Sequence, residues 1–362
     1  MEARKKGKRR PWWMWSLFGL LIVVAGLFVW AAVYGVGVYN ALDGLNKSDE
    51  ESKFTQFKDQ ETATPEPPKW EGTERVNILL MGGDGRGLEK TQVARSDTMM
   101  VVSIDPTTKK AHVFSVLRDT YVDIEGHDRG RINTAVTLGG ERLARTTIGN
   151  LLGLDIQYYI YTEFEGFKSL IDTIGGIDFY VEKDMNYVDN ADGNRYDIHL
   201  KQGQQHLDGD HALQYVRFRH DAMSDFTRTE RQREFMQAVA SKIMSGWNIV
   251  RITDIIKSVS PFIETNLTVE DMLKLGQLGL GISVAGTEQV PPMDLIGEDK
   301  VGGASVIGIK DEDKLREFVQ EALTKDKNAP AATDGTSTST DGTSTDGSTD
   351  SSSTSGSSST SN

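Results

Sequence analysis

Short and long apolar runs alternate along the middle of the chain and predict a series of strands and helices. Short runs cover residues 76–81, 98–104, 111–117, 156–161 and 177–181. All but the fourth stop at glycine or a charged residue, as buried strands do. Runs with a helical spacing of apolar positions cover residues 131–152, 163–174, 208–216, 227–245, 250–260, 268–280 and 311–323. Asp208 is expected to cap the third of these helices. Residues 288–309 are expected to form a strand pair or a loop, with the strand at residues 305–309.

This order of elements predicts the fold class. Strands that alternate with helices indicate an α/β domain in which helices cover both faces of a twisted sheet. The short connections between residues 76 and 117 indicate that part of the sheet is antiparallel, so the sheet is expected to be mixed.

The first forty residues have a different pattern, in which a basic cluster precedes a long apolar run. Residues 4–10 (RKKGKRR) are basic, no charge occurs from Pro11 to Leu42, and residues 17–34 are apolar almost throughout. A helix needs about 20 such residues to cross the hydrocarbon core. We therefore predict a cytoplasmic segment, residues 1–16, and a single transmembrane helix, residues 17–39, with all later residues outside the cell membrane. A cleaved signal peptide is the alternative, but no convincing cleavage site follows the run.

Two polar segments flank the predicted extracytoplasmic domain, residues 76–327. Residues 40–75 carry three prolines and are expected to form a juxtamembrane stalk, with a helix around residues 48–59. Residues 328–362 are rich in Ser, Thr, Gly and Asp with almost no apolar side chains, so they are expected to be disordered.

Composition removes several classes of function. The chain has 362 residues and no cysteine, which excludes a disulfide scaffold, a thiolate metal site and a cysteine nucleophile. The formal net charge is −13, and an acidic body argues against nucleic acid as a partner. The sequence also lacks the GxSxG, GxxxxGK[ST] and HExxH motifs of common hydrolases, P-loop proteins and zinc proteases.

Three charged residues lie at the ends of predicted neighbouring strands, where ligands collect. Asp84 and Asp97 form an acidic pair suited to Mg²⁺, which prefers one or two carboxylates with phosphate oxygens and water. Turn-forming carboxylates that cap local amides are the alternative. Arg118 can reach a phosphate from its strand end, or it can pair with Asp119 or another acid.

The stretch from Ala212 to Phe235 is unusually rich in arginine, with Arg217, Arg219, Arg228, Arg231 and Arg233. This density suggests a multidentate anion such as a pyrophosphate, and a solvated helix with local ion pairs is the alternative. On a helix, Arg228, Arg231 and Gln232 share a face. Arg233 and Glu230 are expected at the solvated surface.

An aromatic cluster follows in the next predicted strand and helix, formed by Tyr158, Tyr159, Tyr161, Phe164 and Phe167. Core packing is the first interpretation, and a groove for a lipid is the second.

Five ordered motifs between residues 75 and 257 together resemble one family. They are NILLMGGDGR (residues 77–86), RSDTMMVVSID (95–105), SVLRDTYVDI (115–124), RINTAVTLGG (131–140) and ALQYVRFRH…DFTRTERQ (212–232). With the predicted anchor, they resemble the LytR-CpsA-Psr family of cell-envelope glycopolymer transferases, including the wall teichoic acid–peptidoglycan ligases. One departure is Leu117, because the family often has proline before its Arg-Asp-Thr.

The resemblance implies a function and a set of site residues. The protein is expected to move an anionic glycopolymer, such as wall teichoic acid or capsule, from a polyprenyl-pyrophosphate carrier to a muramic acid 6-hydroxyl of peptidoglycan. Asp84 and Asp97 are implied to bind Mg²⁺ or Mn²⁺, and the lipid to lie in a hydrophobic tunnel. The implied pyrophosphate ligands are Arg118, Arg217, Arg219, Arg228 and Gln232. The implied catalytic residues are Arg118, Asp225 and Arg228.

Two other functions remain open at the level of the sequence. The same residues suit a polyprenyl-pyrophosphate hydrolase or a lipid-binding module. A transcriptional attenuator is a further alternative, although no basic recognition helix is evident.

Overall fold

The computed structural model describes residues 34–48, 50–58, 64–85, 92–188, 194, 197–219, 224–279 and 281–328. The chain divides into two compact units, Met1–Lys327 and Asn328–Asn362. All helices and strands below belong to the first unit, apart from the last residue of α9.

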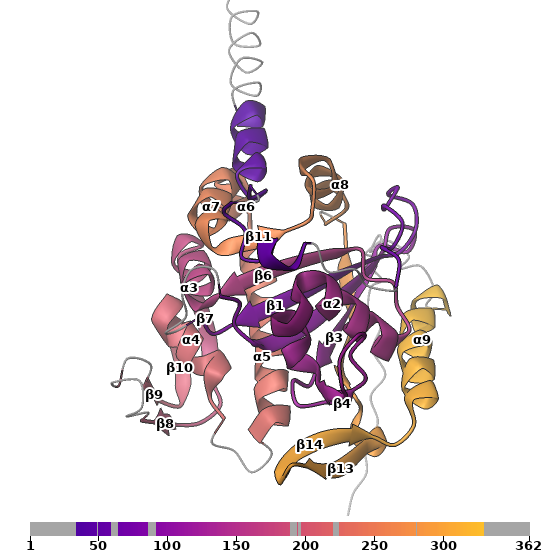
Figure 1. The fold of residues 1–362 in the computed structure, drawn as a ribbon. Coiled ribbons are helices and arrows are strands. Elements are labelled where there is room, and N and C mark those ends of the chain that lie inside the picture. Colours follow the sequence, from indigo (N-terminus) through magenta and orange to yellow (C-terminus); the bar gives the residue numbers. More distant parts are fainter. Residues whose placement is uncertain are drawn as a thin grey trace, which may run out of the picture. The chain divides into compact units, whose positions relative to one another are not determined.

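A six-stranded mixed sheet forms the centre of the first unit (Figure 1). Its strands, in spatial order, are β11 (Ile263–Thr265), β6 (Tyr158–Glu163), β1 (Val76–Gly83), β2 (Ser96–Asp105), β3 (Lys110–Val116) and β12 (Ser283–Val290). β1 runs parallel to β6, and β3 runs parallel to β12. The other three neighbours are antiparallel. The prediction of a mixed sheet is confirmed.

One face of the sheet packs against α2 (Ala135–Leu152) and α9 (Glu312–Asn328). Because side chains alternate along a strand, Leu79, Val101 and Phe114 point to this same face and are fully buried there. Ile148 of α2 and Leu315 of α9 complete the contact. Burying such apolar side chains contributes about 1.5–3 kcal/mol each, which makes this core a main source of stability.

The other side of the unit has a second apolar core. It is built from α3 (Phe164–Thr173), α4 (Gly209–Arg217), α5 (Ser224–Ile243), α7 (Ile252–Val259), β7 (Ile177–Val181), β8 (Met185–Tyr187), β9 (Ile198–Leu200) and β10 (Gly203–Leu207). The Asp208 side chain accepts a hydrogen bond from the His211 amide, which confirms the predicted cap of α4. Phe235 of α5 is buried between α3 and β7, where it contacts the rings of Phe167 and Phe179.

Smaller elements complete the unit. They are α6 (Gly246–Val250), α8 (Val269–Gly279), the pairs β4 (Tyr121–Val122) with β5 (Gly130–Arg131) and β13 (Ile296–Val301) with β14 (Ala304–Ile309), and the 3-10 turns η1 (Thr55–Phe57), η2 (Ile132–Thr134), η4 (Ser260–Phe262) and η5 (Met293–Leu295). The Leu117 amide donates a hydrogen bond to the Val290 carbonyl at 2.9 Å. A proline in place of Leu117 has no amide hydrogen and could not make this bond.

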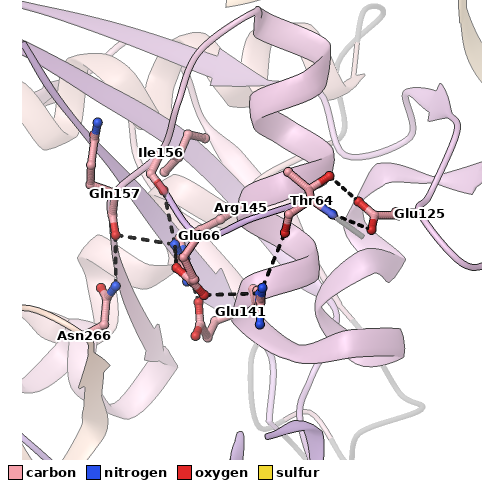
Figure 2. Close-up of polar contacts among 9 residues, drawn as sticks. Thr64, Glu66, Glu125, Glu141, Arg145, Ile156, Gln157 and Asn266 are labelled. Atoms are coloured by element: carbon pink, nitrogen blue, oxygen red, sulfur yellow. Dashed lines mark hydrogen bonds and ion pairs between the residues drawn. The ribbon is translucent and has the colours of Figure 1, made fainter. Parts of the chain in front are cut away.

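The segment predicted as a stalk packs against the domain over part of its length. Leu42, Leu45, Phe54 and Trp70 are buried. Figure 2 shows Glu66 beside Arg145 of α2, and the Arg145 Nη1–Glu66 Oε2 distance is 3.1 Å. Within residues 48–59 the described part holds only the turn η1, so the helix expected there is wrong.

The predicted transmembrane helix lies mostly outside the described residues. Residues 34–43 are helical. Within the described ranges, no helix has both the length and the apolar character needed to span a bilayer.

Candidate active site

A cavity of about 740 Å³ lies between the central sheet and the second core. Leu80, Met100 and Ile160 of its sheet wall point away from the first core, which follows from the alternation along each strand. The apolar part of the lining includes Leu80, Met100, Ile160, Phe167, Val216 and Met236. The charged and polar part includes Asp84, Asp97, Arg217, Arg219, Arg228 and Gln232. One cavity thus joins a long apolar wall to a dense group of charges.

Asp97 of β2 is the centre of the charged group. The Arg118 Nη1 atom donates to Asp97 Oδ1 at 2.6 Å, and the Arg219 Nη2 atom donates to the same oxygen at 3.3 Å. Burial alone raises the pKa of Asp97, but the charges of Arg219, Arg118 and Arg228 outweigh burial and lower it. Asp97 is therefore an ionised carboxylate that binds two guanidinium groups through one oxygen.

The acidic pair fits a cation that takes part of its ligands from a substrate. Asp84 follows β1 and Asp97 lies on β2, which pairs with β1, and both line the cavity. No described residue donates a hydrogen bond to Asp97 Oδ2, so this oxygen can bind a further ligand. Among the described residues no group of three His, Cys, Asp or Glu side chains could hold a metal ion. Two carboxylates suffice for Mg²⁺ where phosphate oxygens and water complete its shell.

Three arginines reach the cavity from the predicted arginine-rich stretch. Arg217 ends α4, and its guanidinium lies over the Phe164 ring with the Cζ atom 5.1 Å from the ring centroid. Arg219 follows after one extended residue, and Arg228 comes from α5 with only 2% of its surface exposed. A buried cation in the wall of a cavity is costly without anions, and Asp97 supplies one of them.

Gln232 lies one helical turn beyond Arg228 and lines the same cavity. Its Nε2 atom donates to the Val216 carbonyl at 3.1 Å. Gln232 therefore joins α5 to the end of α4, the helix that positions Arg217.

Two other predicted site residues differ from the cavity-lining group. Arg118 is not among the residues that line the cavity, and it reaches the site through its ion pair with Asp97. It also lies 3.5 Å from Asp119, the pairing considered as its alternative role. Asp225 lies in the first turn of α5, but its side chain falls outside the described residues.

The remaining arginines of the stretch are less exposed than expected. Arg231 is buried and donates to the Phe218 carbonyl at 2.5 Å, so it stabilises the turn between Arg217 and Arg219. Arg233 is half-buried, and this burial lowers its pKa. The expectation that Arg233 is solvated surface is therefore wrong. Glu230 is exposed, as expected.

Sequence reasoning missed one acidic side chain of the cavity, Glu163. It ends β6, whose parallel register with β1 places it opposite Gly83, next to the loop that carries Asp84. A Cβ atom on Gly85 would lie 2.5 Å from the Glu163 carboxyl carbon, so a larger residue at position 85 would require the Glu163 side chain to move. Lys53 forms an ion pair with Glu163. The position of Glu163 at the end of a predicted strand is the sequence feature that could have identified it as a site residue.

The aromatic cluster divides between the two roles considered for it. Tyr158, Tyr159 and Tyr161 are buried in the cores. Phe164 and Phe167 line the cavity. Core packing is confirmed for the tyrosines, whereas the two phenylalanines form part of an apolar wall.

Comparison with known proteins assigns this arrangement to a family. The LytR_cpsA_psr family model matches residues 34–322, which include both cores and the cavity. This chain belongs to the LytR-CpsA-Psr family. The membership extends beyond the motif-bearing region to α8, the β13–β14 hairpin and most of α9.

Several relatives of this LytR-CpsA-Psr protein have named activities. The polyisoprenyl-teichoic acid–peptidoglycan teichoic acid transferase TagU of Bacillus mycoides is 32% identical over 270 residues, which are 74% of this chain and 82% of TagU. The transferase TagV of Bacillus subtilis is 31% identical over 316 residues, 85% of this chain and 77% of TagV.

Solved structures share the fold. The crystal structure of Bacillus subtilis TagV matches with a TM-score of 0.57 and 29% identity, covering 69% of this chain and 98% of that structure. TagT with bound octaprenyl pyrophosphate lipid matches with a TM-score of 0.55 and 23% identity, covering 74% and 96%. The α/β architecture around a mixed sheet is therefore common to this protein and to TagV and TagT.

Proposed function

We propose that this protein is a membrane-anchored phosphotransferase that moves an anionic glycopolymer, such as wall teichoic acid or capsule, from a polyprenyl-pyrophosphate carrier to peptidoglycan. The observation that carries the proposal is a cavity in which an apolar wall adjoins three arginines and three carboxylates, Asp84, Asp97 and Glu163. A polyprenyl pyrophosphate has this same division into a hydrocarbon chain and an anionic head. TagU and TagV are named as transferases of teichoic acid to peptidoglycan, which supports peptidoglycan as the acceptor.

The apolar wall and the arginines have separate tasks. Leu80, Phe167 and Met236 bind the polyprenyl chain, because burial removes hydrocarbon from water. Arg217, Arg219 and Arg228 bind the pyrophosphate oxygens. Guanidinium groups form paired hydrogen bonds with phosphates and stay charged at any physiological pH. Gln232 fixes the spacing of these arginines through the Val216 carbonyl.

Asp84 and Asp97 are proposed to hold Mg²⁺ or Mn²⁺ beside the pyrophosphate. When bound, the ion supplies positive charge that neutralises the phosphate oxygens. Arg118 binds Asp97 through Oδ1, and Oδ2 is the oxygen proposed to bind the ion. The proposed catalytic contribution of Arg118 therefore acts through the position and ionisation of Asp97.

The transfer step exchanges one phosphoester partner for another. A hydroxyl oxygen of peptidoglycan attacks the phosphorus that carries the glycopolymer and forms a new P–O bond. The P–O bond to the polyprenyl phosphate breaks, and this group leaves with the bonding electrons. Asp225 is proposed to accept the proton of the attacking hydroxyl. Arg228 stabilises the charge that develops on the phosphoryl oxygens, where a preorganised buried cation is most effective.

The cellular location is also a proposal. The apolar run before residue 40 and the basic residues 4–10 support a single-pass anchor with a cytoplasmic N-terminus. The domain then faces the cell wall, where its acceptor lies.

Product analysis tests the proposed reaction. The full chain in lipid vesicles is incubated with polyprenyl-pyrophosphate-linked polymer, Mg²⁺ and peptidoglycan oligomers, and the products are identified by mass spectrometry. We expect a phosphodiester-linked conjugate together with polyprenyl monophosphate. Free phosphorylated polymer without the conjugate would indicate a hydrolase and would overturn the proposal. Omission of the divalent cation should abolish the conjugate.

A further inference from the structure

An exposed apolar patch lies on α6, away from the charged residues of the cavity. Trp247 is 71% exposed, Val250 is 54% exposed and Ile249 is 39% exposed. Trp247 is among the largest apolar side chains and contacts mainly solvent. A soluble surface seldom leaves neighbouring large apolar side chains uncovered without a partner.

The helix at the start of the described chain lies beside this patch. The Tyr34 hydroxyl donates to the Ile249 carbonyl at 3.2 Å. Figure 1 shows residues 34–43 next to α6 and α7. Val36 and Tyr39 on this helix are also exposed. Residues 17–33, which immediately precede Tyr34, are the apolar run predicted to enter the membrane. The chain therefore reaches α6 directly from the proposed anchor.

The apolar end of the cavity lies close to the same region. Val259 ends α7, Ile263 begins β11, and both line the cavity. Between them, the Pro261 carbonyl accepts a hydrogen bond from Lys47 Nζ at 2.7 Å, and Ser260 bonds to the Gly44 carbonyl. The segment that follows the first helix is thus bonded to residues that lie between two apolar lining residues of the cavity, Val259 and Ile263.

We propose that the α6 patch, defined as Trp247, Ile249 and Val250, inserts into the outer interface of the lipid bilayer. Tryptophan favours this interface because its ring is apolar and its indole N–H can bond to head groups. Apolar side chains beside a membrane anchor gain from burial among acyl chains at little entropic cost, since the anchor already confines them. Insertion would hold the apolar end of the cavity towards the bilayer that contains polyprenyl lipids.

The inference rests on the proposed membrane anchor but not on the transfer reaction, so it can be tested without substrate. The chain has no cysteine, and single-cysteine variants therefore carry one label each. Val250→Cys places an environment-sensitive fluorophore in the patch. Val301→Cys is the matched control, because Val301 is a valine of similar accessibility, 40% exposed, on the β13–β14 hairpin. In Figure 1 this hairpin lies at the opposite end of the unit from residues 34–43.

Both labelled full-length chains are placed in phosphatidylglycerol–phosphatidylcholine vesicles and isolated by flotation. Phosphatidylcholine with brominated acyl chains then acts as the quencher. We expect a blue shift and quenching of the Val250→Cys label and neither effect for the Val301→Cys label. Equal quenching at both positions, or at neither, overturns the proposal. A blue shift without quenching shows that a protein surface covers the patch and also overturns it.

Two further observations separate the causes of failure. A chain that does not float with the vesicles overturns the anchor and the patch together, whatever the enzyme activity. Trp247→Gln in the Val250→Cys background is expected to reduce quenching, because the exposed indole supports insertion without contributing to the core. Unchanged quenching in this variant assigns insertion to the anchor alone and contradicts the role of the patch.

Discussion

Asp97 is bound by two arginines through one oxygen. The charges around it should make the stability of the protein depend on pH. Its pKa lies below its ordinary value because Arg219, Arg118 and Arg228 outweigh the effect of burial. A depressed pKa in the folded state means that ionised Asp97 adds stability above the unfolded value of about 3.9. That contribution is lost as the pH falls through the folded pKa.

We predict that Asp97→Asn lowers the free energy of unfolding most at neutral pH. The gap between the wild-type protein and the variant should shrink as the pH falls below about 4, because the unfolded wild-type chain then takes up a proton on Asp97 that the folded protein, with its lower pKa, still resists. Urea unfolding at pH 7 and pH 3.5 measures both gaps. A gap that stays constant or widens at low pH contradicts the ionised state of Asp97.

Arg228 provides a second test at the scale of one residue. We predict that Arg228→Met lowers kcat/KM for polymer transfer by roughly 10²–10³, the range expected for removal of one preorganised charge-stabilising group. Arg228→Lys should recover only part of this loss, because an ammonium cannot form the paired hydrogen bonds of a guanidinium. Arg316→Met is the control, since Arg316 forms ion pairs on α9. An equal loss of kcat/KM in Arg316→Met would show that the change in net charge, and not the position of Arg228, causes the effect.

The sequence indicates most of the charged group, because Asp84 and Asp97 lie at strand ends and the arginines are concentrated in the stretch from Ala212 to Phe235. Asp84, Asp97, Arg217, Arg219 and Arg228 all reach one cavity. It does not predict that Arg118 stands behind Asp97 or that Glu163 lines the cavity. Both facts depend on the order of strands in the sheet, which local pattern does not determine.

At the scale of elements, Arg145 of α2 stabilises the segment before β1. Its side chain is 4% exposed and bonds to Glu141 at 2.7 Å and to Glu66 at 3.1 Å (Figure 2). Burial raises the pKa of Glu141 although Arg145 counteracts it. The ionised state of Glu141 is therefore stabilised by the positive charge of Arg145.

We predict that Arg145→Met lowers the free energy of unfolding by about 3 kcal/mol, because it leaves the half-buried carboxylate of Glu141 without its partner. Arg142→Met is the matched control one turn away. Arg142 pairs with Glu66 at a more exposed position, and its loss should cost about 1 kcal/mol or less. Denaturant unfolding measures the free energy of unfolding of both variants. A similar decrease in the two would show that Arg145 contributes no more than an exposed ion pair.

Two elements differ from the prediction, the strand β12 and the helix expected around residues 48–59, because tertiary contacts rather than local sequence pattern determine them. β12 (Ser283–Val290, SVAGTEQV) is an edge strand with mostly exposed or half-buried side chains, so it lacks the apolar run that identified the buried strands. A helix is predicted around residues 48–59, but the described residues of this segment make contacts with the sheet that decide their conformation. Ser52 and the Lys53 amide bond to Glu264 of β11, and Phe54 packs against Tyr159 and Tyr161.

At the scale of the whole molecule, the cavity exists because the second apolar core does not fill the space between its helices and the central sheet. Its lining comes from positions as distant in sequence as Leu80 and Ile263. From the sequence, Phe164 and Phe167 suggest an apolar groove that could bind a lipid, and both residues line the cavity. The volume of about 740 Å³ follows only from the packing of the helices against the sheet.

We predict that Met236→Trp, which narrows the apolar part of the cavity, raises KM for a long-chain polyprenyl substrate and leaves binding of inorganic pyrophosphate unchanged. Met293→Trp is the control, because Met293 is exposed and does not line the cavity. Steady-state kinetics and pyrophosphate titration measure the two effects. Weaker pyrophosphate binding in Met236→Trp would show that the wall and the charged group are not separate.

The most direct test of the central claim is a crystal structure of the protein with Mg²⁺ and a polyprenyl pyrophosphate. We predict density for the pyrophosphate against Arg217, Arg219 and Arg228, a metal ion at Asp84 and Asp97, and the hydrocarbon chain along Phe164 and Phe167. A pyrophosphate bound away from these arginines, or a chain outside the cavity, would contradict the account.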